Sequence, residues 1–103
     1  MATLRKFEAP FNNGICVLHL PQQSETVALR LLEQNTNDGP LVRIVVIDTG
    51  VTLTYPRIFA LVEDGAEVPP NFKKYIGGYH FKPTMALVHV VELNRPQPPE
   101  PTP

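Results

Sequence analysis

The chain has 103 residues, with 9 basic and 10 acidic side chains and a formal net charge of −1. A chain of this length allows one domain with a limited core, and its balanced charge argues against a dedicated nucleic-acid binder, which would carry a basic face. No apolar run reaches the roughly 20 residues needed to span a bilayer, and the N-terminus lacks an apolar core of signal-peptide length. We therefore expect a soluble, cytoplasmic protein that binds neither nucleic acid nor membranes.

The composition favours strands and turns over long helices. Trp is absent, and 12 prolines and 6 glycines divide the chain into short segments. These segments are rich in Val, Ile, Leu and Thr, which favour strands. The single cysteine, Cys16, cannot form an intramolecular disulfide, which suits a reducing compartment.

The first half of the chain predicts four strands separated by turn residues. Segment 24–34 is ambiguous, because a strand would place Val27, Leu29 and Leu31 on one face, whereas a helix would begin at a capping serine. We favour the strand, and residues 35–40, which contain Asp-Gly, then form a hairpin loop. The predicted strands are 3–8, 15–20, 24–34 and 41–48.

The second half predicts three more strands around a proline-containing loop. Residues 51–55 form either a short extension or part of a long loop. Residues 68–72 cannot be regular sheet, because two prolines remove two backbone donors. Gly77 and Gly78 lie in mid-strand and predict a bulge or the close approach of another backbone. The predicted strands are 57–63, 74–81 and 84–93.

Together these elements predict an all-β fold, a small antiparallel β-sandwich or β-roll of six to eight strands. Residues 1–93 would form this single domain. The remaining segment, 94–103, holds five prolines in ten residues. It predicts an extended, polyproline-like C-terminal tail outside the core.

Two predicted strands are apolar on both faces. In 41–48 and in 85–93, apolar residues occupy odd and even positions alike. A sheet with one wet face alternates apolar with polar residues, and a domain this small can hardly cover every such strand by itself. We therefore expect a homo-oligomer in which a second subunit covers the surplus apolar face. A compact sandwich that buries its central strands on both sides is the alternative.

The strand that ends in Asp48-Thr49-Gly50 raises a question of chemistry. A dimeric aspartic protease presents Asp-Thr/Ser-Gly so that two carboxylates share one proton and activate water. Such proteases usually have Ala or Ser after the glycine, where this chain has Val51. The same residues also form an ordinary turn, in which Asp48 caps the turn and Gly50 supplies a positive φ. We favour the turn and keep a dimeric aspartic protease using Asp48 as an alternative.

No other residues form a convincing catalytic or metal-binding set. His19, His80 and His89 lie on different predicted strands without ligand-like spacing, and a zinc site would need carboxylates, since there is one cysteine. Cys16, in an apolar strand, fits an inert core thiol better than a nucleophile. We therefore nominate no catalytic, metal-binding or cofactor-binding residue, expect no cofactor, and interpret the protein as a non-enzyme.

Eight short segments follow one another along the chain: "RKFE" (5–8), "LHLP" (18–21), "LLEQ" (31–34), "RIVVID" (43–48), "RIFALVEDG" (57–65), "EVP" (67–69), "YIGG" (75–78) and "LVHVVE" (87–92). Their order resembles the pattern of a small family of uncharacterised bacteriophage and prophage proteins. The match covers roughly residues 4–93. The chain departs from the family at Ile44, where the family tends to have Trp, at the "EDG" turn over 63–65, and at Gly78, where it has Thr. The resemblance implies an all-β fold and a phage context, and it brings no activity with it.

These observations lead to one expected function and two alternatives. We expect a non-catalytic accessory protein of phage type in the host-cell cytoplasm. It would act as a homo-oligomer and bind a host protein or a small-molecule ligand, for example to antagonise a host defence. The alternatives are a virion-associated structural or assembly protein and the dimeric aspartic protease.

Overall fold

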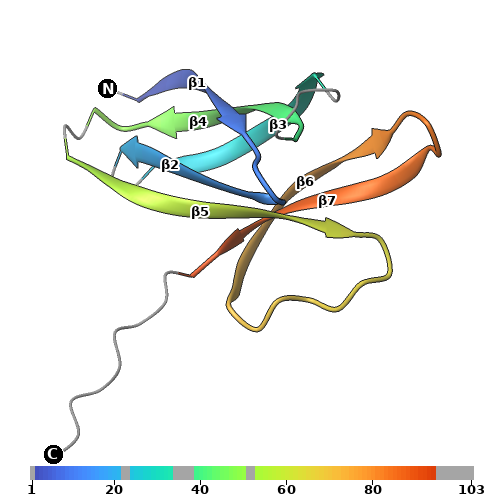
Figure 1. Cartoon of the computed structure of the whole chain (residues 1–103). Coiled ribbons are helices and arrows are strands. Elements are labelled where there is room, and N and C mark those ends of the chain that lie inside the picture. Colours follow the sequence, from blue (N-terminus) through green and yellow to red (C-terminus); the bar gives the residue numbers. More distant parts are fainter. Residues whose placement is uncertain (1, 22–23, 34–38, 51–52, 95–103) are drawn as a thin grey trace, which may run out of the picture.

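The computed structural model describes residues 2–21, 24–33, 39–50 and 53–94 (Figure 1). Within these ranges all regular structure is β, and there is no helix long and apolar enough to cross a membrane. The strands form two antiparallel sheets, sheet A in the order β1-β4-β3 and sheet B in the order β2-β5-β7-β6. The predicted small all-β sandwich is confirmed, and the tail beyond Asn94 lies outside the described residues. The strands are β1 (Thr3–Pro10), β2 (Ile15–Pro21), β3 (Glu25–Glu33), β4 (Leu41–Asp48), β5 (Thr54–Glu63), β6 (Phe72–Phe81) and β7 (Ala86–Leu93).

The ambiguous segment 24–34 contains strand β3, which pairs with β4. A bulge shifts the register of β3 between Thr26 and Ala28. Leu29 and Leu31 consequently pack against the core, but Val27 is 48% exposed. The predicted strand is confirmed. The prediction that Val27 shares a face with the two leucines is wrong, because the bulge inserts one residue between them.

Other strand limits differ from the prediction by two or three residues. Strand β5 begins three residues earlier than predicted and includes Pro56, which a strand tolerates because the ladder with β7 starts only at Ile58. Strand β7 begins two residues later than predicted, since Met85 adopts a left-handed φ of 57° in the turn before it. Most of the predicted loop at 35–40 lies outside the described residues.

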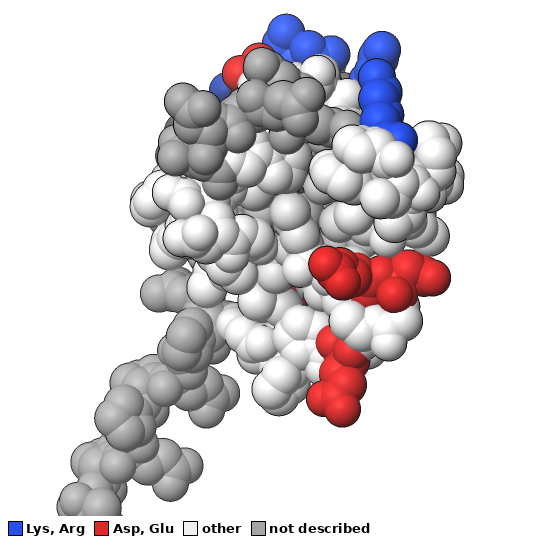
Figure 2. All heavy atoms as spheres, turned by 45° about the vertical axis from the view of Figure 1, so that its right-hand side comes forward, with Lys and Arg blue, Asp and Glu red and all other residues white. Residues whose placement is uncertain are grey.

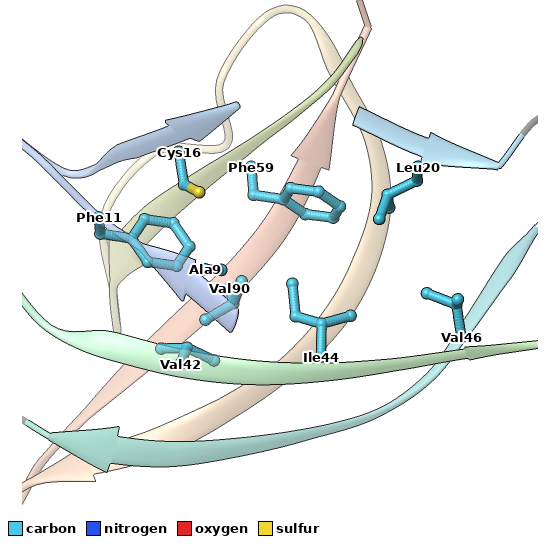
Figure 3. Close-up of a cluster of buried hydrophobic side chains, with 9 residues drawn as sticks. All are labelled: Ala9, Phe11, Cys16, Leu20, Val42, Ile44, Val46, Phe59 and Val90. Carbon is cyan, nitrogen blue, oxygen red and sulfur yellow. The ribbon is translucent and has the colours of Figure 1, made fainter. Parts of the chain in front are cut away.

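The core lies between the inner faces of the two sheets (Figure 3). Sheet A contributes alternate residues of β4, and sheet B contributes Phe59 and Val90. Phe11 and Phe59 are 1% and 0% exposed, and truncating such a ring to Ala costs roughly 3 to 5 kcal/mol. The cluster consists of Ala9, Phe11, Cys16, Leu20, Val42, Ile44, Val46, Phe59 and Val90.

The chain passes from sheet A to sheet B through a tight turn after β1. Asn13 and Gly14 have φ values of 53° and 79°, as in the two-residue turns that Asn-Gly favours. Asn12 and Ile15 exchange backbone hydrogen bonds of 2.9 and 3.1 Å across the turn. The turn therefore fixes where Phe11 leaves β1 and enters the core.

Sheet B carries a second apolar cluster on the face turned away from sheet A. Ala60 of β5 and Val91 and Leu93 of β7 are buried in this cluster, and along β7 the last two alternate with core residues such as Val90. The connection between β5 and β6, residues 64–71, runs along this side of sheet B (Figure 1). This outer face is the part of the fold that positions the candidate site.

Candidate functional site

A pocket of about 280 Å³ lies between the outer face of sheet B and the connection 64–71. Residues of β5, β6 and β7 form one side, and Ala66, Val68 and Pro69 of the connection form the other. Concave and mainly apolar sites of this kind hold small molecules, and this one is at the small end of the usual range. The lining residues are Val62, Glu63, Gly65, Ala66, Val68, Pro69, Phe72, Tyr75, His89 and Val91.

The apolar floor of the pocket follows from the alternation of side chains along the strands. Val62 is opposite His89 in the β5–β7 ladder, and Val91 is opposite Tyr75 in the β6–β7 ladder. Side chains at opposed positions lie on the same face of a sheet, so these four residues meet on the outer face. Val68 at the rim is 65% exposed, which leaves apolar surface available to a ligand.

Three polar side chains from three elements form a hydrogen-bonded chain at the pocket. The Tyr75 hydroxyl on β6 lies 2.8 Å from Nδ1 of His89 on β7. Nε2 of His89 lies 2.9 Å from Oδ1 of Asp64 in the connection. The rings of Tyr75 and His89 are 5.5 Å apart between centroids and tilted by 60°. This Tyr75–His89–Asp64 chain ties the connection to two strands of sheet B.

Gly78 leaves space for this chain. It is opposite His89 in the β6–β7 ladder, and a Cβ at this position would lie 3.2 Å from the Tyr75 hydroxyl oxygen and 3.1 Å from the Val88 carbonyl oxygen. Even alanine would therefore press on the hydroxyl. A register shift between Tyr75 and Gly77 confirms the irregularity that the two glycines predicted.

The surroundings of the pocket carry negative charge. Figure 2 shows acidic side chains in the lower half of one face of the molecule and basic side chains at its top. Glu63, Asp64 and Glu67 are exposed at the end of β5 and in the connection. Among the described residues that line the pocket, none is Lys or Arg. These charges would repel an anionic ligand.

Asp48, the residue of the protease alternative, forms a turn at the end of β4. Its Oδ1 accepts a 2.9 Å hydrogen bond from the Gly50 N–H, and Gly50 has a φ of 87°. Its Oδ2 accepts a 3.0 Å hydrogen bond from Nη1 of Arg5. The Gly50 hydrogen bond, followed by Arg5, holds the pKa of Asp48 below its ordinary value, which favours an ionised carboxylate. The predicted capped turn is confirmed, and Asp48 is not among the residues that line the pocket.

The other residues considered from the sequence stay apart from one another. His19, His80 and His89 lie on β2, β6 and β7, and His80 is opposite Leu87 rather than His89. In the described ranges, no three His, Cys, Asp or Glu side chains are grouped so as to hold a metal ion. Cys16 is buried, as predicted for a core thiol, and burial raises its pKa to about 11.

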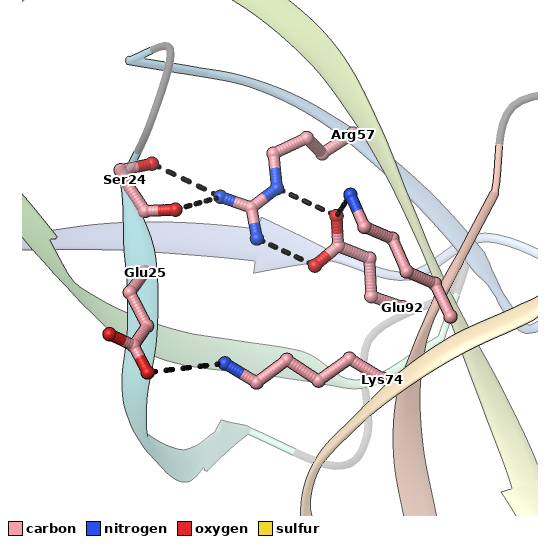
Figure 4. A network of polar contacts seen from close by, with 6 residues as sticks. Ser24, Glu25, Arg57, Lys74 and Glu92 are labelled. Carbon is pink, nitrogen blue, oxygen red and sulfur yellow. Dashed lines mark hydrogen bonds and ion pairs between the residues drawn. The ribbon is translucent and has the colours of Figure 1, made fainter.

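A buried ion pair joins β5 to β7 near the other end of β7 (Figure 4). Arg57 donates to both carboxylate oxygens of Glu92 at 2.7 and 2.6 Å, and the two side chains are 5% and 2% exposed. Nη1 of Arg57 also donates to the carbonyl and hydroxyl oxygens of Ser24, both at 3.0 Å. The hydrogen bonds with Glu92 raise the pKa of Arg57 further. We interpret this pair as structural, because it ties sheet B to the start of β3 and its polar atoms are already bonded.

Sequence reasoning missed both the Tyr75–His89–Asp64 chain and the Arg57–Glu92 pair. Their partners are 14, 25 and 35 positions apart, and such contacts depend on strand register. The sequence segment that could have indicated these contacts is "LVHVVE", because His89 and Glu92 interrupt an otherwise apolar strand. Polar groups in such a strand need hydrogen-bond partners from neighbouring elements.

The chain was compared with models of known protein families, with curated proteins and with solved structures. None of the three comparisons yields a match. The geometry of the pocket must therefore carry the functional argument by itself.

Proposed function

We propose that the protein is a non-catalytic binding module whose outer sheet B pocket holds a small, mainly apolar ligand. One observation supports this function above all. The chain forms an open pocket of about 280 Å³ with an apolar floor, and Tyr75 and His89 of the hydrogen-bonded Tyr75–His89–Asp64 chain line it. Apolar enclosure with a few fixed polar groups is the usual design of a ligand site.

The pocket depends on the connection 64–71, which has to cross the sheet because β5 and β6 run parallel to each other on either side of β7. Here the connection contributes Ala66, Val68 and Pro69 to the pocket. Its position is fixed by the hydrogen bond that His89 donates to Asp64 and by a 3.0 Å backbone hydrogen bond from the Phe72 N–H to the Pro69 carbonyl oxygen.

A titration with p-xylene tests the proposed site. Backbone amide NMR shifts should move around Val62, Ala66 and Val91 as the hydrocarbon enters. Ala66→Trp places an indole at the mouth of the pocket and should weaken p-xylene binding at least tenfold. Ala2→Trp, at an exposed site on another part of the chain, is the matched control and should leave binding unchanged. Shifts that map elsewhere, or binding that survives in Ala66→Trp, would contradict the proposal.

We also propose that the module acts as a homo-oligomer that associates through the outer face of sheet A. Leu4 is 71% exposed there, opposite the half-buried Ile47. Charged Lys6 and Glu8 lie beside this apolar strip on β1, so two copies related by a two-fold axis across the strands could bring Lys6 of each near Glu8 of the other.

The phage-type accessory role rests on the sequence resemblance. The virion-associated alternative is tested by looking for the protein in purified particles.

A further inference from the structure

The polar atoms of the pocket determine which kind of ligand it accepts, and this inference rests on the function proposed above. An ionised Asp64 can only accept hydrogen bonds, so His89 Nε2, at 2.9 Å, carries a proton. In a neutral imidazole Nδ1 is then an acceptor, and the Tyr75 hydroxyl must donate its one proton to it across 2.8 Å. The Tyr75 oxygen can then accept a hydrogen bond from a ligand but has no proton left to donate.

The remaining polar side chain of the lining has the same character. Glu63 borders the pocket from a position opposite Val88, on the other face of the β5–β7 ladder, and its exposed carboxylate is an acceptor only. The Nε2 proton of His89 is already bonded to Asp64. Because the described lining contains no Lys or Arg, its side chains present acceptors on an apolar surface and no unused donor.

We propose that the pocket selects a small apolar molecule carrying one hydrogen-bond donor, such as a phenol or an aromatic amine, and rejects a carboxylate of similar shape. The donor of the ligand would bond to the Tyr75 oxygen, while the hydrocarbon part contacts Val62 and Val91. A carboxylate would bring only acceptors and would meet the negative charges of Glu63 and Asp64. Sites built around a fixed hydrogen-bonding group discriminate against ligands that leave this group unpaired.

Three probes of similar shape test this selectivity: p-cresol carries a donor, p-xylene carries no polar group, and 4-methylbenzoate carries only acceptors. Affinities are measured by NMR titration at pH 8, where imidazoles are usually neutral. In the Tyr75→Phe variant, the ratio of p-cresol to p-xylene affinity should fall about fivefold, the contribution of one hydrogen bond. The p-xylene affinity itself should stay within about twofold of wild type. No shift should appear with 4-methylbenzoate.

Tyr79→Phe is the matched control, because Tyr79 also lies on β6 but packs against the core on the other face of the sheet. It should leave the affinity ratio unchanged. Asp64→Ala removes the acceptor that fixes the proton of His89 on Nε2, and it should lower the ratio of p-cresol to p-xylene affinity by about twofold. Thermal melts show whether each variant folds. If p-xylene binds but neither Tyr75→Phe nor Asp64→Ala changes the ratio, the inferred ligand class is wrong and the binding site stands. If no probe binds, the proposed function fails as well.

Discussion

Strands β4 and β7 have the same two-faced apolar pattern but different surroundings. Both supply core residues from one face, Val46 from β4 and Val90 from β7, each 0% exposed. On its second face, β7 places Val91 in the pocket beneath the connection 64–71, and Val91 is 4% exposed. Along the second face of β4, the described part of the chain has no such connection (Figure 1), and Leu4 beside it is 71% exposed.

The difference shows that one sequence pattern has two physical causes. An apolar residue on the outer face of a central strand needs cover, but the cover can come from the chain itself or from another molecule. In β7 the connection and the neighbouring strands account for the pattern, so this strand gives no argument for a second subunit. The proposed assembly therefore depends on β4 alone.

Val91→Asp compared with Val45→Asp is the strongest test of this contrast. A carboxylate at 91 would be buried without a partner and should cost more than about 4 kcal/mol, enough to unfold a small domain. Val45 lies on the half-buried outer face of β4 opposite Lys6, so the same change there should cost about 1 kcal/mol. Thermal melts followed by circular dichroism compare the two variants, and equal losses would remove the distinction between the strands.

Glu92→Gln should give the next largest effect, because it breaks the buried pair with Arg57 and leaves the guanidinium without its counter-charge. Removing one partner of a buried pair costs about 3 to 5 kcal/mol. Glu25→Gln is the matched control, since the Glu25–Lys74 contact is 3.6 Å long and both side chains are well exposed. Its cost should be under about 0.5 kcal/mol in urea unfolding. A loss at Glu92 no greater than at Glu25 would show that the pair does not hold sheet B to β3.

How far the sequence predicted these features depends on the range of the interaction. Strand β4 was predicted with its correct limits because a run of Val, Ile and Leu and the Asp-Thr-Gly turn that ends it are local signals. The exposed position of Val27 was not predicted, because the bulge in β3 can be recognised only from the pairing of β3 with β4. The pocket was missed for a similar reason. The pocket depends on the strand register that sets Gly78 opposite His89. It also depends on the path of the connection 64–71, and the two prolines in this connection predicted only that it is not a strand.

Val45→Asp also tests assembly, with a smaller effect on stability. If the outer face of sheet A joins two copies, a carboxylate at its centre should disperse the oligomer while the fold persists. Light scattering at micromolar concentrations should then report a mass above 11.5 kDa for the wild type and close to 11.5 kDa for the variant. Wild-type protein that is already monomeric would end the proposal of a homo-oligomer and leave the pocket unaffected.

Asp48→Asn should have the smallest effect, although Asp48 and Glu92 both lie near the end of a strand and both pair with an arginine. Arg5 in the Asp48 pair is 56% exposed, so water already screens that contact. Asparagine can still accept the hydrogen bond from the Gly50 N–H. The melting temperature at neutral pH should fall by no more than about 4 °C, as for surface changes.

The pH dependence of this small difference has a definite sign. The pKa of Asp48 is lowered in the folded protein, first by the Gly50 hydrogen bond and then by Arg5. The ionised carboxylate therefore stabilises the fold above about pH 4, the usual pKa of an unfolded aspartate, and this contribution is lost as the pH falls through the lower folded value. Wild type should thus lose more stability than Asp48→Asn between pH 6 and pH 3, so that the two melting temperatures converge.

A protease would behave differently: wild type would cleave peptides at acidic pH, and Asp48→Asn would abolish cleavage at unchanged stability. Such cleavage would overturn the interpretation of Asp48 as a turn residue, whereas converging melts without cleavage would support it.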